Sequence, residues 1–159
     1  MKPHNAILLT TVSFLSVAAA APKPVYQSHR VTEETVGHAV DIDVDLTGAK
    51  KLYLVITDGG DGYMADWAEW LSPVISGDFG QKKLTEMNPA SVMVGWGELG
   101  INKNAGGQPL VVNNQPVTEG LGAHAPSVIE FDLPAGTKRF TAKGALDKGG
   151  VAQGGGATV

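Results

Sequence analysis

The chain contains no cysteine among its 159 residues. Disulfide bonds, zinc–thiolate sites and thiolate nucleophiles are therefore excluded, as is haem attachment through cysteine. The fold has to be stabilised by its apolar core and, where one is bound, by an ion.

Charge is also sparse, because only 18% of the residues are charged and the formal net charge is −4. Typical domains carry about 25% charged residues. The basic residues come only in pairs, as at Lys50-Lys51, Lys82-Lys83 and Lys138-Arg139. Without a basic block to hold a phosphate backbone, we expect no nucleic-acid binding.

A long apolar run occurs only near the start of the chain. Lys2 precedes the uncharged stretch 6–17, and Ala18-Ala19-Ala20 follows it. This order is typical of an export signal, with cleavage predicted after Ala20. The alternative, a membrane anchor, needs about 20 apolar residues. We therefore predict a secreted protein without a membrane span, in which 1–20 is the signal and 21–39 a linker leading into the first strand.

The remainder, 40–159, reads as short strands separated by turns. Apolar and acidic residues alternate over 40–46, a continuous apolar run covers 52–56, and alternation returns over 127–133. A period of two is the mark of a half-buried strand. Shorter strands are expected at 82–84, 92–94, 110–112 and 139–142. With 21 glycines and 9 prolines at the turns, this pattern indicates an all-β sandwich.

Three local expectations accompany this assignment. Asn113-Asn114 should form a two-residue hairpin, because asparagine tolerates positive φ. The segment 66–71, with its two tryptophans, should be one helical turn or a loop. The end of the chain, 157–159, resembles the start of a strand, so we expect that the final strand is missing and a neighbouring edge is unpaired.

Acidic residues gather in a glycine-rich loop, at Asp58, Asp61 and Asp66. Carboxylate and carbonyl oxygens on such a loop suit Ca²⁺, which takes roughly 6–8 oxygen ligands. The alternative is that these side chains accept hydrogen bonds from backbone N–H groups in a turn. The carboxylates of Asp41, Asp43 and Asp45 share one strand face, for which a solvated surface is the simpler interpretation.

The glycine-rich segment 120–125 predicts close backbone approach and a special turn before His124. Trp96 lies between two glycines. An aromatic ring can pack on the C–H face of a sugar, while an imidazole binds its hydroxyls. The alternative is that both side chains are structural and buried.

Catalysis is not expected. The carboxylates Glu69, Asp66, Asp147 and Glu98 show no spacing that identifies a glycosidase pair. Ser127 and His124 lack a third partner and a nucleophile elbow, and paired metal-ligand histidines are absent.

Two segments resemble a known family. The first, 120–133, reads GLGAHAPSVIEFDL and is followed by Arg139-Phe140 and Ala145-Leu146-Asp147. The second, 46–62, reads LTGAKKLYLVITDGGDG and is followed by DWAEW at 66–70. Both are similar to the NPCBM/NEW2 module, a carbohydrate-binding module first noted in glycosyl hydrolase family 98. Glu69 and Ala145 depart from its usual residues.

The order of the two segments is the reverse of the usual module. Two arrangements remain open: a permuted fold, or the end of one module joined to the start of another. The resemblance implies a galactose-binding-like jelly-roll β-sandwich that binds galactose or another glycan without catalysis, often with structural calcium, as part of a larger multi-module protein. The alternative function is a structural or protein-interaction module. A fragment of a glycoside hydrolase is the third possibility.

The predicted site residues follow from these motifs. The carbohydrate-binding set is Trp96, His124, Asp147 and Arg139. The metal-binding set is Asp58, Asp61 and Asp66.

Overall fold

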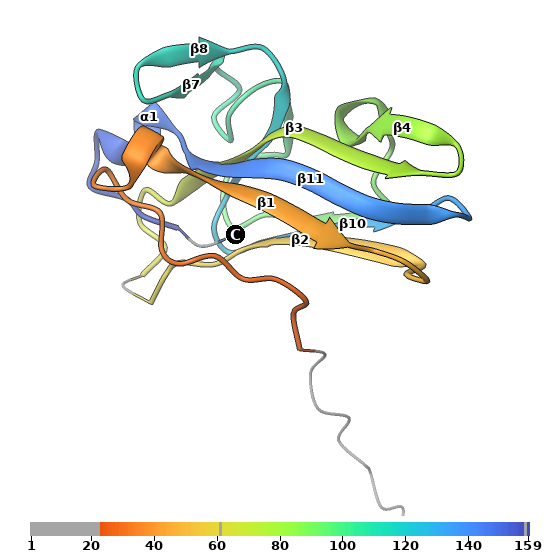
Figure 1. The fold of residues 1–159 in the computed structure, drawn as a ribbon. Coiled ribbons are helices and arrows are strands. Elements are labelled where there is room, and N and C mark those ends of the chain that lie inside the picture. Colours follow the sequence, from red (N-terminus) through yellow and green to blue (C-terminus); the bar gives the residue numbers. More distant parts are fainter. Residues whose placement is uncertain (1–22, 61, 158) are drawn as a thin grey trace, which may run out of the picture.

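The computed structural model describes residues 23–60, 62–157 and 159, so the predicted signal and Asp61 lie outside the described residues. The chain forms two facing antiparallel sheets, which confirms the expected β-sandwich (Figure 1). Among the described residues, no helix is long and apolar enough to cross a membrane.

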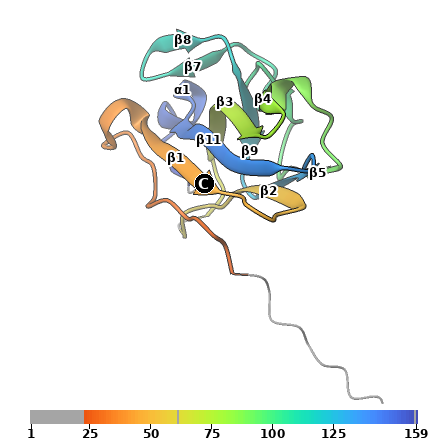
Figure 2. The same ribbon diagram turned by 45° about the vertical axis from the view of Figure 1, so that its right-hand side comes forward.

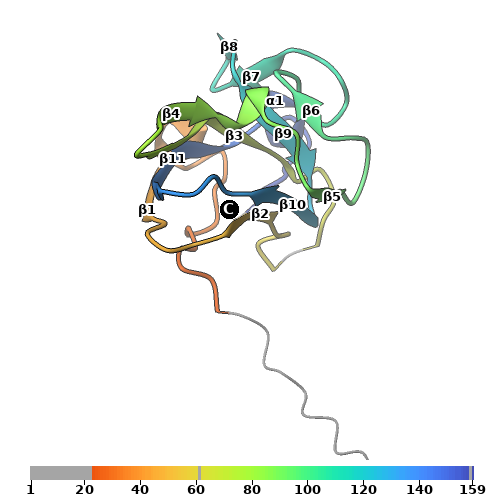
Figure 3. The same cartoon turned by 90° about the vertical axis from the view of Figure 1, so that its right-hand side faces the viewer.

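The larger sheet has six strands, in the order β1-β11-β3-β9-β6, with β4 beside the second half of β3. Their bounds are β1 (Ala39–Asp45), β11 (Thr137–Leu146), β3 (Trp67–Gly77), β9 (Gly120–His124), β6 (Gly100–Ile101) and β4 (Gly80–Lys83). The smaller sheet has the order β2-β10-β5, with bounds β2 (Lys51–Ile56), β10 (Ser127–Asp132) and β5 (Ser91–Met93). Figure 3 shows the two layers nearly end on.

Alternating apolar residues build the core between the sheets. In β2, Leu52, Leu54 and Ile56 are buried while the intervening residues are exposed. Ile129 and Phe131 of β10 show the same alternation, and both are fully buried. The period of two in the sequence therefore identified the inner face of β10 correctly. The continuous apolar run at 52–56 predicted a buried strand instead, and there Tyr53 and Val55 are exposed.

A small second layer covers part of the outer face of the larger sheet. It consists of the hairpin β7 (Leu110–Val112) and β8 (Gln115–Val117) and the short helix α1 (Lys148–Val151) (Figure 2). Leu71, Ala145 and Val112 form an apolar cluster beneath it. Within the described ranges, the remaining helical elements are two 3-10 turns, Val36–His38 and Leu84–Glu86.

The hairpin between β7 and β8 confirms the Asn113-Asn114 turn. Both asparagines have positive φ, 47° and 60°, as a tight turn of the right twist requires. Among the short strands, 110–112 is confirmed, and those near 82–84, 92–94 and 139–142 are present with shifted ends. The strand β4 ends at Lys83, because Leu84 begins a 3-10 turn.

The prediction for 66–71 was wrong, because these residues lead directly into β3, an eleven-residue strand. Ala68 and Trp70 pack in the main core, while Glu69 and Leu71 are buried under the second layer. A strand buried on both faces shows no alternation to read. A register shift near Ser72, whose φ is 46°, also interrupts the pattern.

The segment 120–125 is likewise a strand rather than a special turn. Close approach is confirmed, because a Cβ added at Gly120 would lie 3.0 Å from the carbonyl oxygen of Trp70. The turn comes later, at the cis peptide bond between Ala125 and Pro126.

The two alternating faces of β2 provide a direct test of the core. Replacing Leu54, which is 1% exposed, should cost about 2–5 kcal/mol of unfolding free energy as Leu54→Ala, because a cavity opens in the core. The neighbouring Val55, 39% exposed, should cost less than about 1 kcal/mol as Val55→Ala. Urea unfolding of both variants measures the difference, and equal costs would contradict this assignment of the inner face.

Candidate functional site

Four aromatic side chains gather at one end of the sandwich, and we call them the aromatic cluster: Tyr63, Trp67, Trp96 and His124. The rings of Trp67 and Trp96 are stacked, with centroids 5.3 Å apart. His124 presents its ring edge-on to Trp96 at 5.9 Å and to Tyr63 at 6.5 Å. Three separate stretches of the chain therefore build one surface.

Exposure differs sharply within the aromatic cluster. Trp96 is 53% exposed and Tyr63 is 62% exposed, whereas His124 is only 6% exposed. The expected pair of Trp96 and His124 thus lies together, with Trp96 open to solvent. This exposure disagrees with the alternative in which Trp96 is a core residue, whereas His124 is buried and bonded to the backbone as its structural alternative expected.

Glycines on either side of Trp96 hold it against its neighbours. A Cβ added at Gly95 would lie 2.8 Å from Pro126 Cδ, so only glycine fits there. Gly97 has φ +70° and passes close to the backbone of Ala105. The backbone on either side of Trp96 therefore packs closely against the end of β9 and against the 103–106 loop, which fixes the position of the indole.

The hydrogen bonding of His124 fixes its ring. Its Nδ1 lies 2.6 Å from the carbonyl oxygen of Ala125. A carbonyl oxygen only accepts, so Nδ1 carries the hydrogen and donates it. The Nε2 of the neutral ring is then an acceptor, which is the role that a ligand hydroxyl group needs.

Trp67 is held between two glycines, behind Trp96. Its ring lies 2.8 Å from a Cβ built at Gly106 and 3.2 Å from one built at Gly149. Any side chain at Gly106 would displace the indole. Trp67 thus forms a fixed support for the exposed ring of Trp96, a role that depends on contacts remote in sequence and that local sequence does not reveal.

Asp147, predicted to bind carbohydrate, lies behind Trp67 and is 1% exposed. Its carboxylate accepts hydrogen bonds from Asn104 Nδ2 at 3.2 Å and from the backbone N–H of Gly149 at 2.8 Å. Asn104 Oδ1 in turn accepts from the N–H groups of Gly106 and Gln108. These bonds fix the two glycine segments that hold Trp67.

A second buried carboxyl group, Glu69, lies in the same layer. It is fully buried, and neither of its oxygens makes a hydrogen bond of regular geometry within the described part of the chain, although the Asp147 carboxyl lies close enough to interact with it. Burial raises the pKa of Glu69 to about 10, and the neighbouring Asp147 carboxyl adds to the shift. Glu69 is therefore a neutral acid at pH 7, a state that the residue type alone does not reveal.

Arg139, the remaining residue of the predicted set, is not in the aromatic cluster. It lies opposite Ser76 in the register with β3, whereas Trp67 begins that strand. Nine strand residues span roughly 30 Å. The Arg139 guanidinium pairs with Asp43, with Nε 2.6 Å from Oδ1, and this contact lowers the pKa of Asp43. Lys143 pairs in the same way with Asp41 at 2.7 Å.

Two of the predicted calcium residues, Asp58 and Asp66, accept hydrogen bonds from the backbone. Asp58 Oδ1 accepts from the N–H of Gly60, as in the capping alternative, and buried Asp66 accepts from the N–H of Gly156. The side chain of Arg30 packs against Gly59. Among the described residues, which omit Asp61, no three acidic or histidine side chains gather as a metal site. Calcium binding stays a prediction.

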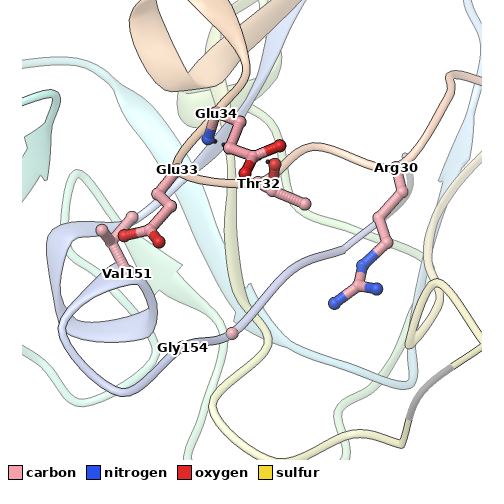
Figure 4. A pocket seen from close by; sticks show the side chains of 7 residues that line it. Arg30, Thr32, Glu33, Glu34, Val151 and Gly154 are labelled. Carbon is pink, nitrogen blue, oxygen red and sulfur yellow. Dashed lines mark hydrogen bonds between the residues drawn. The ribbon is translucent and has the colours of Figure 1, made fainter.

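A small polar cavity of about 260 Å³ lies beside the same loop (Figure 4). Arg30 lies on one side of it, and Glu33 lies near the end of α1 on the other. The cavity is separate from the aromatic cluster.

The support of Trp67 can be tested spectroscopically. Gly106→Ala should displace the indole, because the added methyl group would lie 2.8 Å from the ring. We expect the exciton signal of the stacked Trp67 and Trp96 rings to weaken in circular dichroism. Lys103→Ala, an exposed position in the same loop, is the matched control. An unchanged signal in Gly106→Ala would contradict the arrangement.

The state of Glu69 predicts how stability depends on pH. The folded pKa of about 10 exceeds the ordinary value of 4.5, so the unfolded chain loses this proton first. Unfolding free energy should therefore fall between about pH 4.5 and 10, by up to about 1.4 kcal/mol per pH unit. Glu69→Gln should flatten the fall. Glu86→Gln, at an exposed position, is the control and should leave the pH dependence of the unfolding free energy unchanged. If Glu69→Gln and the unmodified protein show the same pH dependence, Glu69 is not neutral in the folded state.

Comparison with known proteins identifies one family. A family model described as NPCBM/NEW2 domain matches residues 10–76 and 80–159. The match includes both segments quoted above and begins inside the predicted signal. No curated protein and no solved structure gives a significant match. Because the family model covers most of the chain, the protein belongs to the NPCBM/NEW2 family, a family of carbohydrate-binding modules.

Proposed function

We propose that the protein is an exported, non-catalytic module that binds a glycan through the aromatic cluster. The observation that carries the proposal is the exposed Trp96 ring, supported from behind by Trp67 and flanked by His124. Binding to a solvent-exposed indole that is held rigidly in this way loses little side-chain conformational entropy, because the conformation of the ring is already fixed.

The chemistry of the aromatic cluster suits a sugar. The face of an indole packs against C–H groups, and Nε2 of His124 accepts a hydrogen bond from a hydroxyl group. Tyr63 adds a second exposed ring with a hydroxyl group of its own. The Asp147 carboxylate already accepts hydrogen bonds from three N–H groups. In this proposal it does not contact the sugar but fixes the segments that hold Trp67 in place.

The absence of catalysis is part of the proposal. Glycosidases need two carboxyl groups on either side of a bond, about 5–10 Å apart. Glu69 and Asp147 are both buried beneath the second layer, where a glycan has no access. The family resemblance extends the proposal in three ways. It suggests galactose as the sugar, calcium bound in the 58–66 loop, and attachment of the protein to further modules.

A protein-interaction module is the second candidate, and one observation favours it. Val55, Val128 and Met93 form a row across the outer face of the smaller sheet. Val55 and Met93 are 39% and 56% exposed. Exposed apolar rows of this kind occur at protein interfaces.

A glycan array separates the two candidates. The protein should bind selectively, and Trp96→Ala should weaken binding by about tenfold or more, which is the loss of at least ~1.4 kcal/mol. His124→Ala should weaken it as well. Arrays with and without Ca²⁺ test whether the ion contributes.

The matched control is Tyr53→Ala. Tyr53 has the same 53% exposure as Trp96 but lies on the smaller sheet, so binding should not change. If Tyr53→Ala abolishes glycan binding and Trp96→Ala does not, the site is on the sheet face. A folded protein that binds no glycan would favour the protein-interaction candidate.

A further inference from the structure

A sharp corner at Ala65 and Asp66 leads the chain into β3. Ala65 has φ 64°, which is unusual for a residue other than glycine. Asp66 is only 1% exposed, although aspartate side chains mostly lie at the surface. A left-handed residue beside a buried carboxylate indicates that the surrounding structure holds this corner in place.

The backbone of Asp66 is connected to three members of the aromatic cluster. Its N–H donates to the carbonyl oxygen of Tyr63 at 3.4 Å, and its carbonyl oxygen accepts from the N–H of Ala125 at 3.0 Å. The carbonyl oxygen of Ala125 in turn accepts from Nδ1 of His124. Trp67 follows Asp66 directly, as the first residue of β3. A displacement of the corner would therefore move these three aromatic side chains relative to one another.

The side chain of Asp66 attaches the corner to glycines of α1 and of the segment that follows it. Its Oδ1 accepts a buried hydrogen bond from the backbone N–H of Gly156, with the two atoms 3.0 Å apart. The carbonyl oxygen of Ala65 lies 2.0 Å from a Cβ built at Gly155 and 2.6 Å from one built at Gly150. Only glycine leaves room for the carbonyl group at these two positions.

The strand bridge next to Gly156 holds this N–H donor independently of Asp66. Val31 and Ala157 exchange two backbone hydrogen bonds, of 2.8 Å and 3.1 Å. The side chain of Arg30 also packs on Gly156, because a Cβ built there would lie 2.7 Å from its Nε. Removing the carboxylate of Asp66 would therefore free the corner, while the donor stays where it is.

We propose that Asp66 is a positioning residue of the glycan site, because its buried carboxylate fixes the corner to which the aromatic cluster is attached. The inference rests on the proposed function, and Asp66 acts without touching the glycan. One oxygen atom is enough to accept the Gly156 hydrogen bond. A Ca²⁺ ligand differs in this respect, since the affinity of such a site depends on the charge of its ligands.

The test compares Asp66→Asn with Asp66→Ala by two measurements. The first is the nuclear Overhauser contact between the rings of Tyr63 and His124, whose centroids are 6.5 Å apart. The second is the Kd for galactose, measured by NMR titration.

Asparagine keeps an oxygen for the Gly156 N–H, so the ring contact should persist and the Kd should change by less than about threefold. Alanine leaves that N–H without its acceptor. The ring contact should then weaken, and the Kd should rise by about tenfold or more. Recovery by the conservative variant separates positioning from a need for charge.

Two control variants accompany the pair. The carboxylate of Asp45 also accepts one backbone hydrogen bond, from Thr47 at 2.8 Å, but it lies at the end of β1. Asp45→Ala should therefore leave both measurements unchanged. Leu54→Ala weakens the core from the smaller sheet, and below its thermal midpoint it should keep the ring contact and the galactose affinity. An equal loss in Leu54→Ala and Asp66→Ala would mean general destabilisation and would overturn the proposal.

Two further outcomes would overturn it. One is an unchanged ring contact and Kd in Asp66→Ala, and the other is an equal loss in Asp66→Asn, which would assign the charge to an ion. If Asp66→Ala does not fold, Asp66→Ser takes its place, because its shorter side chain holds the oxygen farther from Gly156. A protein that binds no glycan contradicts the proposed function, whereas the ring contact between Tyr63 and His124 still decides the role of Asp66.

Discussion

Burial of β3 on both faces is the constraint on which the rest of the structure depends. Its inward residues, Ala68 and Trp70, complete the core between the two sheets. Its outward residues include Trp67 and Leu71, which would expose an apolar surface if they were left uncovered, and the carboxyl group of Glu69 between them. The second layer of β7, β8 and α1 exists to cover them, and the loops of that layer carry the residues that hold the aromatic cluster.

The position of the aromatic cluster follows from this constraint. Trp67 begins β3, so its ring lies where the strand emerges from beneath the second layer. Asn104 and Asp147 fix the two glycine segments around that ring, and Trp96 stacks on its exposed side. The aromatic cluster, which we propose as the binding surface, is therefore an extension of the packing of β3. Mutations in the second layer should affect ligand binding without any contact to the ligand.

The same burial accounts for the least typical residue of the molecule, Glu69. An ionised carboxylate beneath the second layer would lack both water and a cationic partner among the described residues. Burial and the neighbouring Asp147 carboxyl raise the pKa of Glu69, which favours its protonated form.

The sequence by itself determined the fold class, the family and the inner faces of β1 and β10, and it named Trp96 and His124 together as candidate site residues. These features depend on local periodicity and on short motifs, which can be read along the chain. Only the tertiary structure decided that 66–71 is a central strand, because burial on two faces erases the alternation that marks a strand. It also separated Arg139 from the other site residues and placed Asp147 behind Trp67, since register between distant strands sets those positions. The partners of Trp67 and the state of Glu69 depend on contacts with the 103–106 loop and with α1, which are remote in sequence and leave no local signal.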